Sequence, residues 1–142
     1  MENLPEGMDQ SEAEEIMRIA TEYCRSISKT EEEAQQMLAA LAGIVQEQGA
    51  KLVHIGNVLF LVLVRGKEYV EIHTMGEEKR PRDMAKNFMD LAKFLKDIGV
   101  KVAYTYAPDQ KFEKLAKMVD LDIKKMKSDV QGTMMNVYVV EL

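Results

Sequence analysis

An uninterrupted apolar run from Val58 to Val64 constrains the fold of this chain more than any other feature. The run is far shorter than the roughly 20 residues that a membrane-spanning helix needs. Turn residues lie on both sides of it, Gly56-Asn57 before and Arg65-Gly66-Lys67 after. A short apolar run between turns is typical of a strand that is covered on both faces. We therefore expect this segment to be a buried strand of a sheet.

The first half of the chain predicts two helices and three strands. Residues 11–48 carry apolar residues at helical spacing in two stretches. Each stretch begins with the S/T-x-x-E spacing of a capping box, in which two side chains bond backbone N–H groups that the helix leaves unpaired. The two boxes are Ser11 with Glu14 and Thr30 with Glu33. The segments at 51–55 and 68–74 flank the apolar run across short turns, which predicts an antiparallel meander.

The second half alternates helices and strands. Pro81 suits the first turn of a helix that Gly99 ends. This helix is long enough to connect parallel strands at 68–74 and 101–107. A fourth helix is expected to start at Pro108-Asp109, and its inward residues would be Phe112, Leu115, Ala116 and Val119. Two closing strands are expected at 121–127 and 134–142, joined by a turn at Gln131-Gly132.

The predicted order is ααβββαβαββ, an α/β fold with a mixed sheet: an antiparallel meander followed by a parallel crossover. No repeat or linker divides the chain, so we expect one domain over residues 1–142, with a flexible start at residues 1–10.

Composition excludes several classes of function. The chain has 142 residues and a formal net charge of -5, which argues against nucleic acid as a general partner. With one cysteine, Cys24, it has neither an intrachain disulfide nor a cysteine-based zinc site, and two histidines are too few for an all-histidine metal site. We expect no metal. The acidic start has no apolar segment typical of a signal peptide, so a soluble protein that is not secreted by that route is expected.

The order and length of these elements resemble the fold of the Gcn5-related N-acetyltransferase superfamily, abbreviated GNAT, over residues 11–142. The overall look is also similar to small GNAT-like proteins of tailed bacteriophages, some of which are carried in the virion. The resemblance implies that the parallel strands at 68–74 and 101–107 splay apart, and that acetyl-CoA inserts between them.

The family's pyrophosphate-binding motif, Q/R-x-x-G-x-G/A, corresponds here to residues 80–85. Arg80 and Ala85 match its ends, but Asp83 stands where the family has its first glycine. A carboxylate repels a pyrophosphate and fills the approach, so we expect acetyl-CoA to bind weakly or not at all. If a cofactor binds, the resemblance assigns it to a set of residues at the start of this helix. The set is Arg80, Arg82, Asp83, Met84, Ala85 and Lys86. With Lys79, the cations of this set form either an anion site or an ordinary solvated surface.

Catalytic candidates follow from the same resemblance. A carboxylate or histidine on the strand at 68–74 often serves GNAT enzymes as the base for the acceptor amine, and Glu71 and His73 alternate on one face of that strand. Both can equally be the polar face of a half-covered strand. The family's acid, a tyrosine near the end of the fourth helix, corresponds to Ala116. Tyr106 or Tyr104 would have to replace it.

Two functions therefore stay open at this stage. The preferred expectation is a non-catalytic GNAT-like protein without a cofactor that contacts a protein partner, such as a phage virion component, and is cytoplasmic or virion-associated. Met134 and Met135 on the final strand, expected near a sheet edge, would suit such a contact. The alternative is an N-acetyltransferase that transfers acetyl from acetyl-CoA to an amine. No membrane contact is expected, and the sequence does not specify an oligomeric state.

Overall fold

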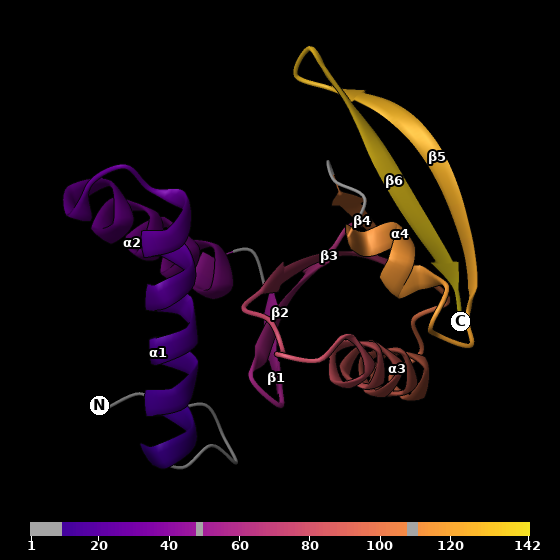
Figure 1. Ribbon diagram of the computed structural model, residues 1–142, viewed down its shortest axis with the longest axis horizontal. Helices are drawn as coiled ribbons and strands as arrows, with labels where there is room; N and C mark the ends of the chain where they lie inside the picture. Colours follow the sequence, from indigo (N-terminus) through magenta and orange to yellow (C-terminus); the bar gives the residue numbers. More distant parts are fainter. Residues whose placement is uncertain (1–9, 48–49, 108–110) are drawn as a thin grey trace.

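The ten predicted elements occur in the predicted order, which confirms the α/β fold (Figure 1). A computed structural model describes residues 10–47, 50–107 and 111–142. The elements are α1 (Gln10–Ile27), α2 (Glu31–Glu47), β1 (Lys51–Ile55), β2 (Val58–Val64), β3 (Tyr69–Met75), α3 (Pro81–Asp97), β4 (Val102–Ala107), α4 (Lys111–Ala116), β5 (Asp122–Val130) and β6 (Thr133–Glu141). The expected flexible start is wrong at Gln10, which begins α1, and residues 1–9 lie outside the described residues.

The strands form one mixed sheet in the order β1-β2-β3-β4-β6-β5. The first three strands are an antiparallel meander, β3 and β4 are parallel, and β6 pairs antiparallel with both β4 and β5. The final strand β6 is therefore the second strand from the edge, near the sheet edge as expected but not at it. The edge belongs to β5, because the chain turns back at the β5–β6 hairpin and inserts β6 beside β4.

The parallel strands β3 and β4 pair over a short stretch and then part. Only Tyr69, Val70 and Glu71 of β3 have partners on β4, namely Val102, Ala103 and Tyr104. Strand β3 continues to Met75 and β4 to Ala107, where β4 pairs with β6 alone. This is the splay that the resemblance predicted.

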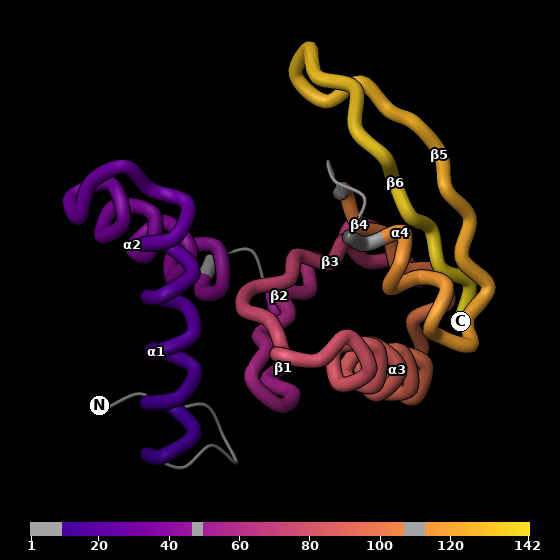
Figure 2. The backbone as a smooth tube through the Cα atoms, in the orientation of Figure 1, coloured from indigo at the N-terminus to yellow at the C-terminus, as the bar shows by residue number. Residues whose placement is uncertain are grey.

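Helices cover both faces of the sheet, with α1 and α2 on one side and α3 on the other (Figure 2). Strand β2 alternates between the two layers, as its apolar sequence predicted. Its residues Phe60 and Val62 pack in the core cluster that contains Leu91 and Leu95 of α3. Leu59, Leu61 and Leu63 pack in the other cluster, with Ile19 and Ala20 of α1. Full burial of each such side chain contributes about 1.5–3 kcal/mol, so β2 holds the two layers together.

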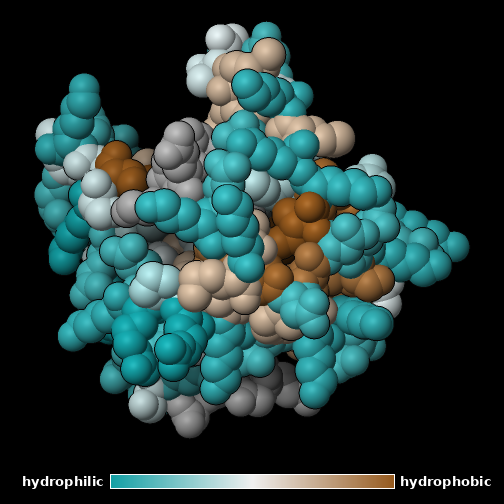
Figure 3. Space-filling view, turned by 45° about the vertical axis from the view of Figure 1, so that its right-hand side comes forward, coloured by the Kyte–Doolittle hydropathy of each residue, from teal (hydrophilic) through white to brown (hydrophobic). Residues whose placement is uncertain are grey.

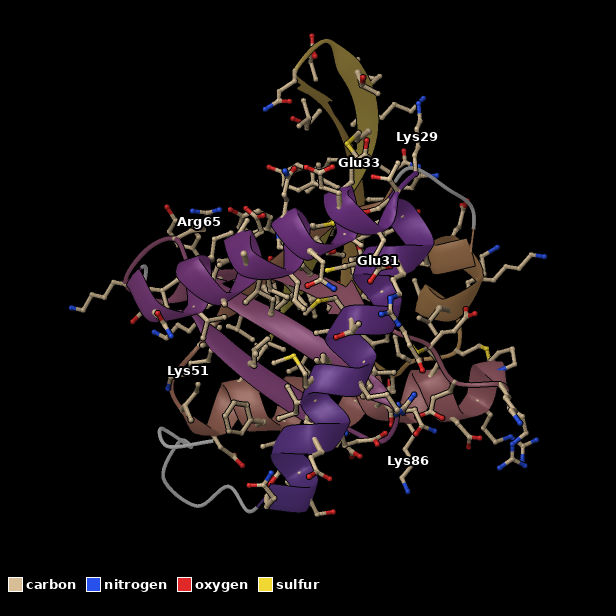
Figure 4. The ribbon with its side chains drawn as sticks, turned by 90° about the vertical axis from the view of Figure 1, so that its left-hand side faces the viewer. Lys29, Glu31, Glu33, Lys51, Arg65 and Lys86 are labelled. Atoms are coloured by element: carbon tan, nitrogen blue, oxygen red, sulfur yellow. The ribbon has the colours of Figure 1, made fainter. Side chains whose placement is uncertain are left out.

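Helix ends agree with the sequence in part. The hydroxyl of Thr30 accepts a hydrogen bond from the N–H of Glu33 at 3.1 Å, while the Glu33 carboxylate accepts the N–H of Lys29 at 3.0 Å. The second capping box is thus present, with its return bond one residue earlier than usual. Figure 4 labels Lys29 and Glu33 near the start of α2. The first box is wrong, because Ser11 lies inside α1.

The β5–β6 hairpin turns at the predicted residues. Gln131 and Gly132 have φ of 51° and 84°, the left-handed backbone that two-residue hairpin turns require. The fourth helix is shorter than expected, since α4 ends at Ala116 and Val119 lies beyond it. Its predicted start at Pro108-Asp109 falls outside the described residues. No helix within the described ranges is long and apolar enough to cross a membrane.

Candidate active site

Glu71 lies at the point where the two parallel strands part. It is the last residue of β3 that faces a β4 residue, Tyr104, and it is only 8% exposed. Three side chains donate hydrogen bonds to its carboxylate. Arg65 Nε reaches Oε1 at 3.2 Å and the Tyr104 hydroxyl reaches the same oxygen at 3.3 Å, while His73 Nε2 contacts Oε2. A buried carboxylate is therefore fully hydrogen-bonded at the mouth of the splay.

The charges around Glu71 determine what it can do. Burial by itself would raise the pKa of the Glu71 carboxyl, but His73 and then Arg65 outweigh it and hold that pKa below its ordinary value. Burial and the neighbouring Glu71 charge raise the pKa of the Tyr104 hydroxyl. Glu71 thus stays ionised and Tyr104 stays protonated at neutral pH. A carboxylate that accepts three hydrogen bonds and has a low pKa is a weak base. Glu71 is instead well placed to orient the imidazole of His73.

His73 and the tyrosines lie on the same side of the sheet as Glu71. Alternation along β3 puts Glu71 and His73 on the face of Met75, which packs in the cluster formed with α1 and α2. Ala103 packs on the α3 side, so Tyr104 and Tyr106 also face α1 and α2. The rings of Tyr104 and Tyr106 meet edge to face with centroids 5.8 Å apart. The structure therefore gathers Glu71, His73 and Tyr104, and Tyr106 adjoins them through a ring contact.

Arg65 was not singled out from the sequence. It follows β2 in the turn to β3, and its N–H donates to the carbonyl of Tyr69 at 3.2 Å. This turn geometry brings its side chain to Glu71, six residues further on. Figure 4 labels Arg65, whose side chain is 41% exposed. Only the hairpin signal at Arg65-Gly66-Lys67 could have indicated its place beside β3.

The predicted cofactor motif lies at the start of α3. Arg80 precedes the helix, and no side chain caps the first turn. Pro81 has no N–H, and the N–H groups of Asp83 and Met84 both donate to the Arg80 carbonyl. The Arg80 guanidinium in turn binds Asp83, with Nε 2.8 Å from Oδ2. Among residues 81–84, Arg82 alone therefore keeps a backbone N–H for a ligand.

The side chains of the motif point in different directions. Ala85 is buried and Met84 packs against the core, so neither side chain is available to a ligand. Arg82 and Lys86 are exposed. Asp83 is partly exposed, and its pairing with Arg80 neutralises the carboxylate that was expected to repel a pyrophosphate. The motif thus offers cationic side chains rather than a row of backbone donors.

A second polar network fixes the loop between β3 and α3. Glu78 Oε1 accepts the N–H of Asn57 at 2.7 Å and the Nδ2 of Asn87 at 3.0 Å, and Oε2 accepts Asn57 Nδ2 at 3.1 Å. These bonds connect the loop to the β1–β2 turn and to α3. Gly76, with φ of 86°, lets the loop pass close to Asn57 and Ile19, because a Cβ there would lie 2.8 Å from the Asn57 carbonyl oxygen. Sequence reasoning missed Glu78, since nothing local marks contacts with residues 21 and 9 positions away.

Two hollows adjoin these groups on opposite sides of the sheet. A cleft of about 940 Å³ lies between α1 and the β3–α3 loop, and its lining includes Arg18, Tyr23, Lys79 and Arg80. A smaller apolar hollow of about 40 Å³ lies on the α3 side and reaches Ile72 and Thr105, among other residues. The larger cleft therefore borders the β3–α3 loop and the start of α3, whereas the smaller hollow borders the splay itself.

Other reactive side chains give no comparable site. Within the described ranges, no group of three or more histidine, cysteine, aspartate or glutamate residues could hold a metal ion. Cys24 is 2% exposed and burial raises the pKa of its thiol, which disfavours the reactive thiolate. His54 places Nδ1 3.8 Å from Glu12 Oε1, on the outer strand β1 and away from the splay.

The splayed parallel pair, the two flanking layers and the order of elements define the fold of the GNAT acetyltransferases. Solved structures of that class match nearly the whole chain. The paia N-acetyltransferase from Thermoplasma acidophilum, in complex with coenzyme A, matches with TM-score 0.60 and 13% identity over 95% of this chain and 96% of its own. Ribosomal-protein-alanine N-acetyltransferase from Brucella melitensis matches with TM-score 0.56 and 7% identity, over 95% and 96% of the two chains. The microcin C7 self immunity acetyltransferase MccE, in complex with acetyl-CoA and AMP, matches with TM-score 0.56 and 11% identity, over 93% and 88%.

This chain therefore has the GNAT fold. No protein-family profile matches its sequence, and no curated protein does. The identities are too low to carry over activity, substrate or site residues. The roles of the residues described above consequently rest on the geometry of this chain.

Proposed function

We propose that this protein is an N-acyltransferase that moves an acyl group from acyl-CoA to an amine, with His73 as the base. The contact between Glu71 and His73 at the parting of β3 and β4 carries the proposal. Histidine is the most common general base in enzymes, and a carboxylate partner fixes the orientation and the tautomer of its ring. A solvated polar strand face would not need a buried carboxylate with three donors. This reverses the order of the two functions expected from the sequence.

The residues present fit acyl-CoA, although less fully than the motif of the family implies. The splay leaves β3 backbone groups beyond Glu71 unpaired with β4, as an inserted pantetheine arm requires. The uncapped start of α3 carries Arg80 and Arg82, with Lys86 one turn further, and suits phosphate groups. Pro81 and the N–H bonds to the Arg80 carbonyl reduce the backbone donors. We expect phosphate binding to depend mainly on these cationic side chains.

The chemistry requires one proton acceptor and one proton donor. Acyl-CoA supplies a thioester, whose acyl carbon bonds the amine nitrogen while its bond to sulfur breaks and CoA leaves. His73 takes the proton that the amine loses, and Glu71 stabilises the imidazolium by its charge. Tyr104 and Arg65 keep Glu71 in place. Tyr106 is the candidate donor to the departing sulfur, because it lies beside Tyr104 on β4 and its hydroxyl has no hydrogen-bond partner among the described residues.

Titration calorimetry with acetyl-CoA, followed by a thiol-release assay with a panel of amines, tests the proposal. The panel should include amino acids, polyamines and short peptides with a free N-terminus. Binding of acetyl-CoA with thiol release that depends on one amine class supports it. A protein that binds neither CoA nor acetyl-CoA at millimolar concentration would contradict it.

A non-catalytic GNAT-like protein that contacts a protein partner is the second candidate. The reduced backbone donors at α3 and Ala116 at the acid position favour it. The β5–β6 hairpin is the candidate contact surface, since Met126 and Met134 are 55% and 67% exposed and the hairpin extends past the end of β4. The comparisons give no support to a phage or virion role. Recovery of the native protein in a fixed complex without acyl-CoA binding would favour this candidate.

A further inference from the structure

An apolar hollow lies directly behind the candidate active site, between the sheet and α3. Its floor is formed by Ile72 of β3 and Thr105 of β4, and Leu91 and Leu95 of α3 form one wall. Leu121 and, from β6, Val140 also line it. Figure 3 shows apolar side chains gathered in a patch bordered by hydrophilic ones, on the side of the molecule that carries α3 and the β5–β6 hairpin. The residues that line the hollow are themselves almost all apolar.

The position of the hollow is set by the parting of the strands. Ile72 follows Glu71 and Thr105 follows Tyr104, the last facing pair. Since successive side chains of a strand point to opposite faces, Ile72 and Thr105 lie behind that pair. A thioester at the splay would therefore have the polar groups on one side and the hollow on the other. An acyl chain extending from it has this apolar space within reach.

The size and lining of the hollow define what it can take. Its lining is almost entirely aliphatic and aromatic, so burial of a polar or charged group there would be unfavourable. Its volume is about 40 Å³. A water-sized group needs about 10–15 Å³ of such space, so the hollow holds roughly three groups of that size. This corresponds to the three carbons beyond the carbonyl of a butyryl group.

We propose that this hollow is an acyl-chain pocket and that the natural acyl donor carries a short linear chain longer than acetyl, with butyryl as the representative length. The inference rests on the proposed function and names the donor class of the same site. The transfer stays balanced as before: the acyl carbon bonds the amine nitrogen, its bond to sulfur breaks, the base takes the amine proton and CoA leaves as a thiol. The pocket acts only on the chain behind the reacting carbon.

Calorimetry with a series of CoA thioesters tests the pocket without depending on turnover. The probes are CoA, acetyl-CoA, propionyl-CoA, butyryl-CoA, hexanoyl-CoA and decanoyl-CoA. Each methylene that enters the pocket should tighten binding roughly fourfold, so Kd should fall from acetyl-CoA to butyryl-CoA. The gain should stop or reverse by decanoyl-CoA. Equal or tighter binding of acetyl-CoA than of butyryl-CoA would overturn the inference.

Two variants that change the pocket in opposite directions sharpen the test. Ala92 lines the hollow from α3, so Ala92→Leu should abolish the preference for butyryl-CoA while leaving the Kd of acetyl-CoA within about twofold. Leu121→Ala should shift the optimum toward hexanoyl-CoA, and it tests the pocket even if Ala92→Leu does not fold. Ala20→Leu is the matched control, because Ala20 is also buried but packs in the cluster on the other face. Chain-length preferences that both pocket variants leave unchanged would overturn the inference.

The outcomes separate this inference from the proposed function. If the protein binds neither CoA nor any thioester of the series, the N-acyltransferase proposal itself fails. If it binds them all with the same Kd regardless of chain length, only the acyl-chain pocket fails. A thiol-release assay with butyryl-CoA and acetyl-CoA, using the same amine panel, should show the same chain-length preference as binding.

Discussion

The hydroxyl of Tyr104 donates a hydrogen bond to the carboxylate of Glu71 at 3.3 Å, across the last facing pair of the parallel strands β3 and β4. This bond lies at the boundary between a closed sheet and an open splay. On one side of the boundary the sheet is held by backbone hydrogen bonds. On the other side β3 and β4 expose unpaired backbone groups to each other, with the Glu71 cluster on one face and an apolar hollow on the other.

Replacement of His73 tests the proposed base. His73→Gln removes the proton acceptor, so we expect kcat to fall by about 10²–10⁴-fold with a smaller change in the KM of acyl-CoA. Steady-state kinetics with acyl-CoA and the preferred amine measure both constants. His54→Gln is the matched control, because His54 lies on β1 away from the splay. A His73 variant with wild-type kcat would assign the base elsewhere.

Replacement of Glu71 should lower stability in a pH-dependent way. The pKa of the Glu71 carboxyl is held below its ordinary value, so the ionised carboxylate stabilises the folded state above the pKa of an unfolded glutamate, and this effect is lost as the pH falls through the folded pKa. Glu71→Gln should cost about 1–3 kcal/mol at pH 7, and the difference from wild type should shrink below the pKa of an unfolded glutamate. Urea unfolding at several pH values measures it. Glu68→Gln is the control, since Glu68 is exposed and its ion pair with Lys101 should contribute little to stability. If Glu71→Gln and wild type differed in unfolding free energy by the same amount at all pH values, the expectation would be contradicted.

Replacement of Asp83 should strengthen acyl-CoA binding. Asp83 occupies the Arg80 guanidinium, which a phosphate would otherwise use. Asp83→Asn removes the competing charge, and we expect the Kd of CoA to decrease by up to about fivefold by calorimetry, in proportion to one exposed charge pair. Asp83→Gly should also improve binding if backbone access limits it, at some cost to the helix. Asp97→Asn, at the other end of α3, is the control and should leave the Kd of CoA unchanged. Weaker CoA binding by Asp83→Asn would contradict the expectation and show that the Asp83 carboxylate supports the site.

Replacement of Glu78 should loosen the β3–α3 loop. Glu78→Gln keeps one acceptor oxygen but replaces the other with an NH₂ group, which would face an N–H donor of Asn57 or Asn87. Because two donors cannot bond each other, about 1–3 kcal/mol of stability should be lost. Because the hydrogen bonds from Asn57 and Asn87 lower the pKa of Glu78, this loss should be largest at neutral pH. The KM of acyl-CoA should rise more than the KM of the amine. The neighbouring Glu77→Gln, which removes an exposed carboxylate, should change neither quantity.

The two capping motifs allow a paired stability test. Thr30→Ala removes the bond to the Glu33 N–H and should cost about 1 kcal/mol, or a fall in Tm of about 3 °C. Ser11→Ala should change stability by less than about 0.5 kcal/mol, since Ser11 lies inside α1 rather than at its start. Thermal unfolding followed by circular dichroism compares them. Equal losses in the two variants would contradict the observed helix ends.

Much of the fold was predictable because its signals are local. The apolar run at Val58–Val64 predicted a strand covered on both faces, and its residues do divide between two core clusters. Pro81 and the Gln131-Gly132 turn marked a helix start and a hairpin correctly. The missing signals concerned neighbours in space: the sequence did not indicate that β6 would lie second from the edge with β5 at the edge.

By itself, the sequence determined the type and order of the elements and the candidate residues Glu71 and His73, because periodicity, turn residues and strand alternation act over a few positions. Only the tertiary structure decided which of these residues form a site. Tyr104 reaches Glu71 from 33 positions away, and Glu78 meets Asn57 from 21 positions away. Both contacts depend on the register of β3 against β4 and on how the β3–α3 loop packs. Register and loop packing arise from many distant side chains at once, so no local pattern encodes them.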